Sequence, residues 1–105
     1  MQDNKVPNPN GRKGGEKHQN KVKEVVVQVE KKGLLASLEH FLKLVTGKRK
    51  FIDVAGLDSE GNEIEYHQVG KETKKGLPVK RERDTIEEIS NSKDVEIYFH
   101  PYNKE

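Results

Sequence analysis

The sequence contains no cysteine, so disulfide bonds, thiolate zinc sites and a cysteine nucleophile are all excluded. It also lacks any run of about 18 apolar residues, the length that a membrane-spanning helix needs. No charged segment followed by an apolar stretch stands at the beginning, where a secretory signal would lie. We therefore expect no membrane-spanning segment, and the missing cysteines leave the redox compartment open.

Several motifs of known chemistry are missing as well. Gly11, Gly14 and Gly15 follow no predicted strand, so they do not form a Walker or Rossmann phosphate-binding loop. The 4 histidines are scattered, and without cysteine they make no zinc pattern. The nucleophile elbow of the serine hydrolases is also absent.

Composition limits the size of the core. Of the 105 residues, 30% are hydrophobic and 36% are charged, which suits one domain with a modest core. Residues 1–15 are rich in Pro, Asn and Gly and have almost nothing apolar, so we expect a flexible lead-in there. Residues 16–105 then form the single domain.

Hydrophobic spacing predicts the elements of this domain. It favours helices at 16–32 and 77–90, and strands at 38–45, 51–58, 63–69 and 94–100. Gly33 fits the end of the first helix, and Pro78 fits the first turn of the second. Residues 34–45 match a helix as well as a strand, and we assign a strand. The predicted class is therefore α/β or α+β, with the order α-β-β-β-α-β.

The segment from residue 51 to residue 71 is the most informative part of the chain. Its two strand-like runs flank a Ser-Glu-Gly-Asn turn and predict a β-hairpin. Polar side chains lie inside these runs, Asp53 in the first and Glu65, His67 and Gln68 in the second. Facing residues of antiparallel strands lie about 5 Å apart, so one acid from each strand can share a divalent cation. Metal-dependent nucleases use this arrangement.

The register of the hairpin decides which polar residues meet. A two-residue loop at the turn places Asp53 opposite Gln68, with Lys71 just beyond. A slip of one residue instead brings Glu65 and His67 to the face of Asp53. The sequence does not choose between these registers. We favour the second, because two acids hold a hard cation better than one acid and an amide do.

Basic residues are unevenly distributed, although the formal net charge is only +2. One cluster lies within residues 12–23 and a second at residues 48–50. The third follows the hairpin and consists of Lys71, Lys74, Lys75, Lys80, Arg81 and Arg83. The last two clusters flank the candidate site, as the binding surface for a phosphate backbone requires. We therefore expect a polyanionic substrate.

Four segments carry a recognisable pattern: RKGGEKHQNKV, RKFIDVAGLD, EYHQVGKETKKGLPVKRERDTIEEI and FHPYN. Together with the element order, they resemble the restriction-endonuclease-like, or PD-(D/E)XK, nuclease toxin domains at the C-termini of bacterial polymorphic and contact-dependent inhibition toxins. The resemblance covers nearly all of residues 11–103. It implies a restriction-endonuclease-like core, in which helices flank a central mixed sheet.

The same resemblance implies an activity and partners. The domain would be a magnesium-dependent nuclease that acts in the cytoplasm of a target bacterial cell, secreted or delivered as part of a larger protein. A cognate immunity protein would neutralise it in the producing cell. Neither delivery nor immunity is visible in the residues themselves.

The resemblance also assigns roles to the polar residues of the hairpin. Asp53 matches the metal-binding aspartate of the family's second motif. The third motif, an acid followed two residues later by lysine, is matched loosely by Glu65 with His67 in place of the lysine. It is matched equally loosely by Gln68, in place of the acid, with Lys71 one position late. The resemblance therefore implies that Asp53 and Glu65 bind Mg²⁺, or another divalent cation such as Mn²⁺ or Zn²⁺.

Other residues receive supporting roles. Related resolvases carry a glutamate early in the first helix. Here that position holds His18, with Glu16 close by, and the resemblance allows either side chain to approach the metal from the helix. Hydrolysis needs a group that orients water or takes its proton, and His67 or Lys71 suits this task. The flanking phosphates would be bound by Lys74, Lys75, Lys80, Arg81 and Arg83.

Two classes of function follow. The first is a metal-dependent endonuclease acting on DNA or on structured RNA such as tRNA, as the toxic effector of a bacterial competition system. The second is a noncatalytic module that binds nucleic acid or protein on the same scaffold, because the lysine of the third motif is displaced. Metal binding that depends on Asp53 separates them.

Overall fold

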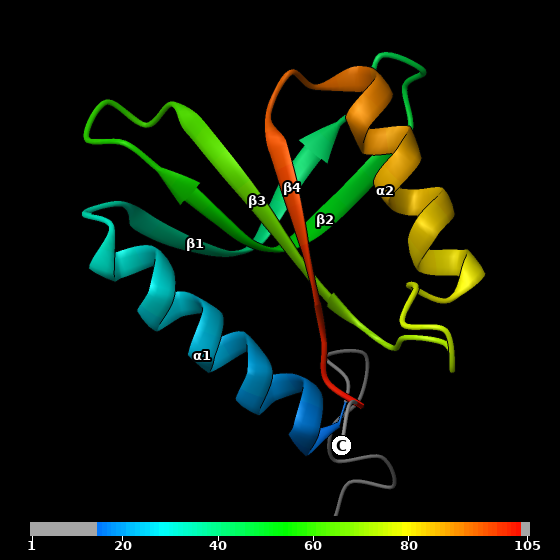
Figure 1. Ribbon diagram of the computed structural model, residues 1–105. Coiled ribbons are helices and arrows are strands. Elements are labelled where there is room, and N and C mark those ends of the chain that lie inside the picture. Colours follow the sequence, from blue (N-terminus) through cyan, green and yellow to red (C-terminus); the bar gives the residue numbers. More distant parts are fainter. Residues whose placement is uncertain (1–14, 104–105) are drawn as a thin grey trace, which may run out of the picture.

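The computed structural model describes residues 15–103 (Figure 1). Its elements are α1 (Glu16–Lys31), β1 (Leu35–Lys43), β2 (Arg49–Leu57), β3 (Glu63–Gly70), α2 (Lys80–Ser92) and β4 (Glu96–Pro101). The predicted order α-β-β-β-α-β is confirmed. The predicted lead-in, residues 1–15, lies outside the described residues except for Gly15.

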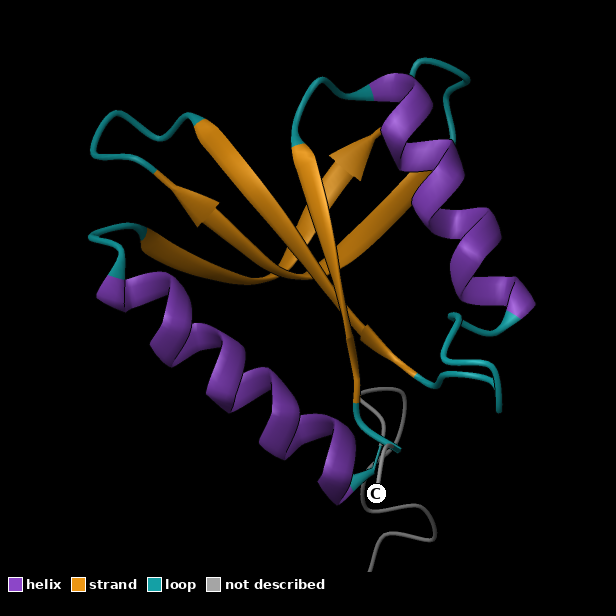
Figure 2. Ribbon diagram, viewed as in Figure 1, coloured by secondary structure: helices purple, strands orange, loops and turns teal. Residues whose placement is uncertain are grey.

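The strands form one four-stranded mixed sheet in the order β1-β2-β3-β4. β2 pairs antiparallel with both β1 and β3, whereas β3 and β4 are parallel. A parallel pair needs a crossover connection, which α2 and its flanking loops supply. Figure 2 shows the twisted sheet between α1 and α2, in agreement with the predicted α+β class. Neither of the described helices has the length and apolar content to cross a membrane.

Residues 34–45, which the sequence left between helix and strand, contain the strand β1. It begins at Leu35 rather than residue 38, because Gly33 ends α1 in the left-handed region with φ of 84° and turns the chain at once. It ends at Lys43 rather than residue 45. The chain then turns at Gly47, whose N–H donates to the Leu44 carbonyl at 2.8 Å.

The second helix begins at Lys80, later than the predicted residue 77. Leu77 and Pro78 belong to the preceding loop instead. The Thr73 N–H donates to the Leu77 carbonyl at 2.6 Å, and Glu72 forms an isolated bridge with Pro78. These bonds hold the loop that leads from the end of β3 to α2.

Two apolar clusters fix the helices to the sheet. On the side of α1, Val25 and Val29 pack with Val54 and Val69. On the side of α2, the buried residues are Leu42, Leu44, Ile52, Ala55, Tyr66 and Ile89. The Tyr66 hydroxyl donates to Glu63 at 2.6 Å, so this buried ring has its polar atom satisfied.

A bulge sets the register of the β2–β3 hairpin. The loop at residues 58–62 is longer than the two-residue turn considered from the sequence. A shift in pairing between Gly56 and Leu57 compensates for this length, so that Val54 is paired with His67. This register is the one that a two-residue loop would give.

The register places Asp53 opposite Gln68, and the register favoured from the sequence is wrong. Glu65 is instead paired with Gly56, three positions along β2 from Asp53. The physical reason is the bulge, which changes the pairing by one residue. Apolar alternation alone does not reveal such an insertion.

Candidate functional site

Asp53 and Gln68 stand where the regular β2–β3 pairing ends. The Asp53 N–H donates to Gln68 Oε1 at 3.0 Å, and the Val69 N–H donates to Asp53 Oδ2 at 2.8 Å. The two side chains thus take the place of backbone partners. The other carboxylate oxygen of Asp53, Oδ1, lies 3.6 Å from His18 Nε2 on α1. Asp53 is therefore fixed through one oxygen, while the other faces His18.

The backbone of β1 is irregular at the position beside Asp53. Glu39 lies between Leu38 and His40, which pair with β2, and its φ is 47°. A non-glycine residue held in a sparsely populated region costs on the order of 1–3 kcal/mol. Strain of this kind concentrates where the surrounding structure positions functional groups.

Burial raises the pKa of Asp53 above its ordinary value. The Val69 N–H and the His18 ring act in the opposite direction, and the charge of Glu39 adds to the increase. Since 23% of the Asp53 side chain is exposed, the group is desolvated but still reached by solvent. The carboxylate thus carries a charge that its surroundings compensate only in part.

A second acid, Glu82 of α2, enters the same region against Gly70. A Cβ atom at Gly70 would lie 2.7 Å from Glu82 Cδ and 2.8 Å from its Oε2, so only glycine leaves room for this carboxylate. Burial raises the pKa of Glu82, and the charge of Asp53 raises it further, whereas Arg81 and His18 lower it.

Sequence reasoning missed Glu82, because an acid in the first turn of a helix is common. The one available signal was Gly70. A glycine at the end of a strand run marks a place where another group approaches the backbone closely.

These acids line one cleft of about 1110 Å³. Its polar lining includes His18, Asp53, Gln68, Lys71, Arg81 and Glu82, and its apolar lining includes Leu38, Phe51 and Val79. The structure therefore brings together five of the residues selected from the sequence. It adds Glu82, which the sequence did not indicate.

Glu65 and His67 do not join this cleft. Glu65 Oε2 lies 2.6 Å from His67 Nε2, and His67 Nδ1 lies 2.8 Å from His100 Nε2. Lys32 Nζ donates to both Glu65 oxygens at 3.1 Å. Although burial acts to raise it, the bonds from His67 and Lys32 hold the pKa of Glu65 below its ordinary value. The predicted sharing of a cation by Asp53 and Glu65 is therefore not what the structure shows.

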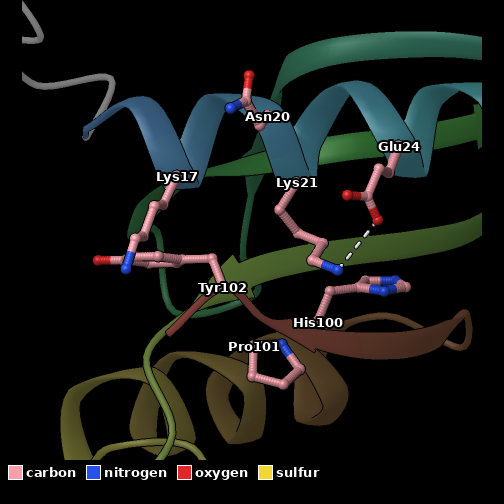
Figure 3. A pocket seen from close by; sticks show the side chains of 7 residues that line it. All are labelled: Lys17, Asn20, Lys21, Glu24, His100, Pro101 and Tyr102. Carbon is pink, nitrogen blue, oxygen red and sulfur yellow. Dashed lines mark hydrogen bonds and ion pairs between the residues drawn. The ribbon is translucent and has the colours of Figure 1, made fainter. Parts of the chain in front are cut away.

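His100, the last residue in the hydrogen-bonded series Glu65–His67–His100, lines a smaller groove between α1 and the end of β4 (Figure 3). The groove measures about 600 Å³, and Lys21 and Glu24 above His100 form an ion pair at 3.1 Å. Tyr102 lines both this groove and the larger cleft. Its ring meets His18 edge-on, with centroids 5.5 Å apart.

The basic residues after the hairpin separate into two groups. Lys71 and Arg81 line the cleft. Among the residues that the structure describes, Lys74, Lys75, Lys80 and Arg83 lie outside its lining. Lys80 instead lies 2.8 Å from Asp84 on the exposed face of α2. Of the five residues predicted to bind phosphates, only Arg81 lines this cleft, and it is joined there by Lys71, which was predicted to act on water.

The chemistry of the cleft can be compared with the needs of a divalent cation. Within residues 15–103, no group of three or more His, Cys, Asp or Glu side chains is arranged to hold a metal ion. Asp53 and Glu82 provide two carboxylates, however, and Mg²⁺ commonly binds through one or two carboxylates, several waters and substrate phosphates. The donor set therefore fits Mg²⁺ and does not fit an all-protein cage.

Comparison with known proteins adds one similarity of fold. No family model and no curated protein matches this sequence. Among solved structures, a chain in a cryo-EM structure of a DrdV–DNA complex superposes with a TM-score of 0.51 and 16% identity. The match covers 83% of this chain but 10% of the other. At this identity the similarity concerns the fold, which is that of a part of a protein solved in complex with DNA.

Proposed function

We propose that this chain is a metal-dependent nuclease domain of the restriction-endonuclease-like type, with its active site in the cleft of Asp53 and Glu82. The proposal rests on this pair of part-buried carboxylates, which β2 and α2 bring into one cleft with Lys71 and Arg81. Acids whose surroundings raise their pKa values are a common mark of a functional site. The fold shared with a protein in a DNA complex supports nucleic acid as the substrate.

The residues of the cleft suit phosphodiester hydrolysis. Asp53 Oδ1 and the Glu82 carboxylate would hold Mg²⁺, or Mn²⁺ or Zn²⁺, and such an ion polarises a phosphoryl oxygen and lowers the pKa of water. His18, whose Nε2 lies 3.6 Å from Asp53 Oδ1, would accept a proton from water in the cleft. Arg81 and Lys71 supply positive charge for the phosphate.

Gln68 acts as a positioning residue for Asp53. Its amide oxygen accepts from the Asp53 N–H and fixes the backbone on which that carboxylate stands. This role differs from the metal-binding role that the family's third motif implies for this position.

The test is cleavage of supercoiled plasmid DNA and of total tRNA by the purified chain. We expect cleavage with Mg²⁺ that disappears in EDTA and falls by at least about 100-fold in Asp53→Asn. Asparagine keeps an oxygen for the Val69 N–H, so the fold is preserved. Asp84→Asn, on the exposed face of α2, is the matched control and should cleave like the wild type.

The competing proposal is a noncatalytic binding module. It is favoured by Gly70, which stands two residues after Gln68, where the family's third motif has lysine. Binding of nucleic acid without cleavage by the wild-type chain, with Mg²⁺, Mn²⁺ or Zn²⁺ present, would establish this alternative.

The resemblance to toxin domains extends the proposal to a toxic effector that acts in the cytoplasm of a target bacterium and is neutralised by an immunity protein. The basic residues Lys23, Lys71 and Arg81 at the cleft would suit an acidic surface on such an inhibitor. Growth of bacteria that express the chain, compared with bacteria that express Asp53→Asn, tests toxicity directly. Equal growth of the two strains would contradict it.

A further inference from the structure

An exposed apolar patch borders the cleft on the strands β1 and β2. Phe51 is 61% exposed, Leu38 58% and Phe41 49%. The rings of Phe41 and Phe51 meet edge-on with centroids 5.6 Å apart, and Phe51 and Leu38 both line the cleft. A single exposed apolar residue is ordinary, but a contiguous group of large ones beside a polar cleft indicates a contact surface.

The patch lies next to the groups that the proposed function places at the phosphate. Phe51 is two residues before Asp53 in β2, a separation of about 7 Å along a strand. Lys23, Lys71 and Arg81 line the same cleft. One cleft therefore offers an aromatic face, positive charge and the carboxylates of Glu39, Asp53 and Glu82. A nucleotide has the complementary parts, a flat base and a charged phosphate.

An aromatic wall selects for a base that is not stacked. Within a duplex, both faces of each base are covered by its neighbours, so a protein ring reaches them only when the base leaves the stack. Bases of single strands and loops have accessible faces, and stacking on aromatic side chains tolerates any base.

We propose that the cleft binds an unpaired nucleotide, with its base against Phe51 and Leu38 and its phosphate towards Arg81 and Lys71. This inference rests on the proposed function and names its substrate class: nucleic acid with an unpaired nucleotide at the site of cleavage. Intact duplex would bind through its phosphates alone.

The test measures binding in EDTA, where cleavage does not occur. Short fluorescent oligonucleotides are titrated as a single strand, as a blunt duplex and as a hairpin with 2-aminopurine in its loop. Phe51→Ala removes the ring, and Phe51→Leu keeps an apolar side chain without a π face. Leu35→Ala is the matched control, because Leu35 is 62% exposed on β1 and is not part of the cleft lining.

We expect the wild-type chain to prefer the single strand and the loop, and to quench 2-aminopurine. Phe51→Ala should weaken single-strand binding by about 5- to 150-fold, the range for loss of one stacked base. Phe51→Leu should fall between Phe51→Ala and the wild type. Duplex affinity should not change in any of these variants, and Leu35→Ala should bind like the wild type.

Equal single-strand binding by Phe51→Ala and the wild type would overturn the inference. So would self-association of the wild-type chain, seen by sedimentation, that Phe51→Ala abolishes without changing nucleic-acid affinity, because the patch would then join two copies. The proposed nuclease activity and the proposed binding of an unpaired nucleotide can be contradicted independently of each other. Absence of cleavage with Phe51-dependent binding contradicts only the nuclease, whereas duplex cleavage that is insensitive to Phe51→Ala contradicts only the unpaired substrate.

Discussion

Asp53 has a structural role through one carboxylate oxygen, and the proposed function gives the other oxygen a chemical role. Oδ2 accepts the Val69 N–H, and Oδ1 faces His18. The sequence identified this residue because an acid inside an apolar strand is unusual. It could not show that only one of the two oxygens faces His18, since that depends on how β2 and β3 meet. Asparagine is therefore a cleaner probe of its chemistry than alanine.

Glu82 gives the sharpest expectation at the residue scale. Its pKa is raised by burial and by Asp53, so its ionised form lowers the stability of the folded state at neutral pH. We expect Glu82→Gln to leave Tm unchanged or higher, while Mn²⁺ affinity, measured by calorimetry, falls by about tenfold or more. Glu87→Gln, an exposed acid on the same helix, is the control.

A second variant probes the same carboxylate from the opposite side. Gly70→Ala would place Cβ 2.7 Å from Glu82 Cδ and push this flexible side chain away, with little damage to the backbone. It should therefore reproduce the loss of Mn²⁺ affinity. Retained affinity in both variants would exclude Glu82 as a ligand.

At the element scale, the bond between Lys32 and Glu65 fastens the end of α1 to β3. Glu65 also partners His67, whose side chain is 4% exposed. Glu65→Ala leaves this buried ring nitrogen unsatisfied, so we expect a loss of about 2 kcal/mol in the free energy of unfolding, measured in urea. Glu24→Ala removes an exposed pair with Lys21 and should cost under about 0.5 kcal/mol. Equal losses in the two variants would show that the buried bond between Glu65 and His67 adds no stability beyond that of an exposed ion pair.

Prediction of elements succeeded where the signal was local. Helical spacing of Val22, Val25, Val26 and Val29 located α1, and alternation in residues 95–99 located β4. Prediction of the register failed, because the bulge between Gly56 and Leu57 depends on how two strands meet. The register that this bulge sets is also the reason why Glu65 and His67 are separated from Asp53.

At the scale of the whole molecule, stability should depend on pH. Burial, and then the charge of His67, lower the pKa of His100 to about 4. The unfolded chain, with an ordinary histidine pKa near 6.5, binds more protons between these values. Stability is therefore present above about pH 6.5 and is lost as pH falls towards 4.

The variant His100→Gln isolates this contribution. With solvent screening taken into account, we expect the wild type to lose on the order of 1–2 kcal/mol more than the variant between pH 6.5 and 4, in urea unfolding. The carboxylates of Asp53 and Glu82 act in the opposite direction in both proteins, so the difference belongs to His100. If the free energy of unfolding changed with pH in the same way in both proteins, the predicted contribution of His100 would be contradicted.

The order of the elements and the α+β class were predictable from the chain alone, because they depend on local periodicity and on residue type. Asp53 stood out as an acid inside an apolar strand, and the resemblance to nuclease domains then favoured it as a metal ligand. Which polar residues meet depends on how distant segments pack. The bulge aligned Asp53 with Gln68, and the missing side chain of Gly70 admitted Glu82 from α2. Contacts between distant segments depend on register and on free space, and neither is written in the spacing of residues along one strand or helix.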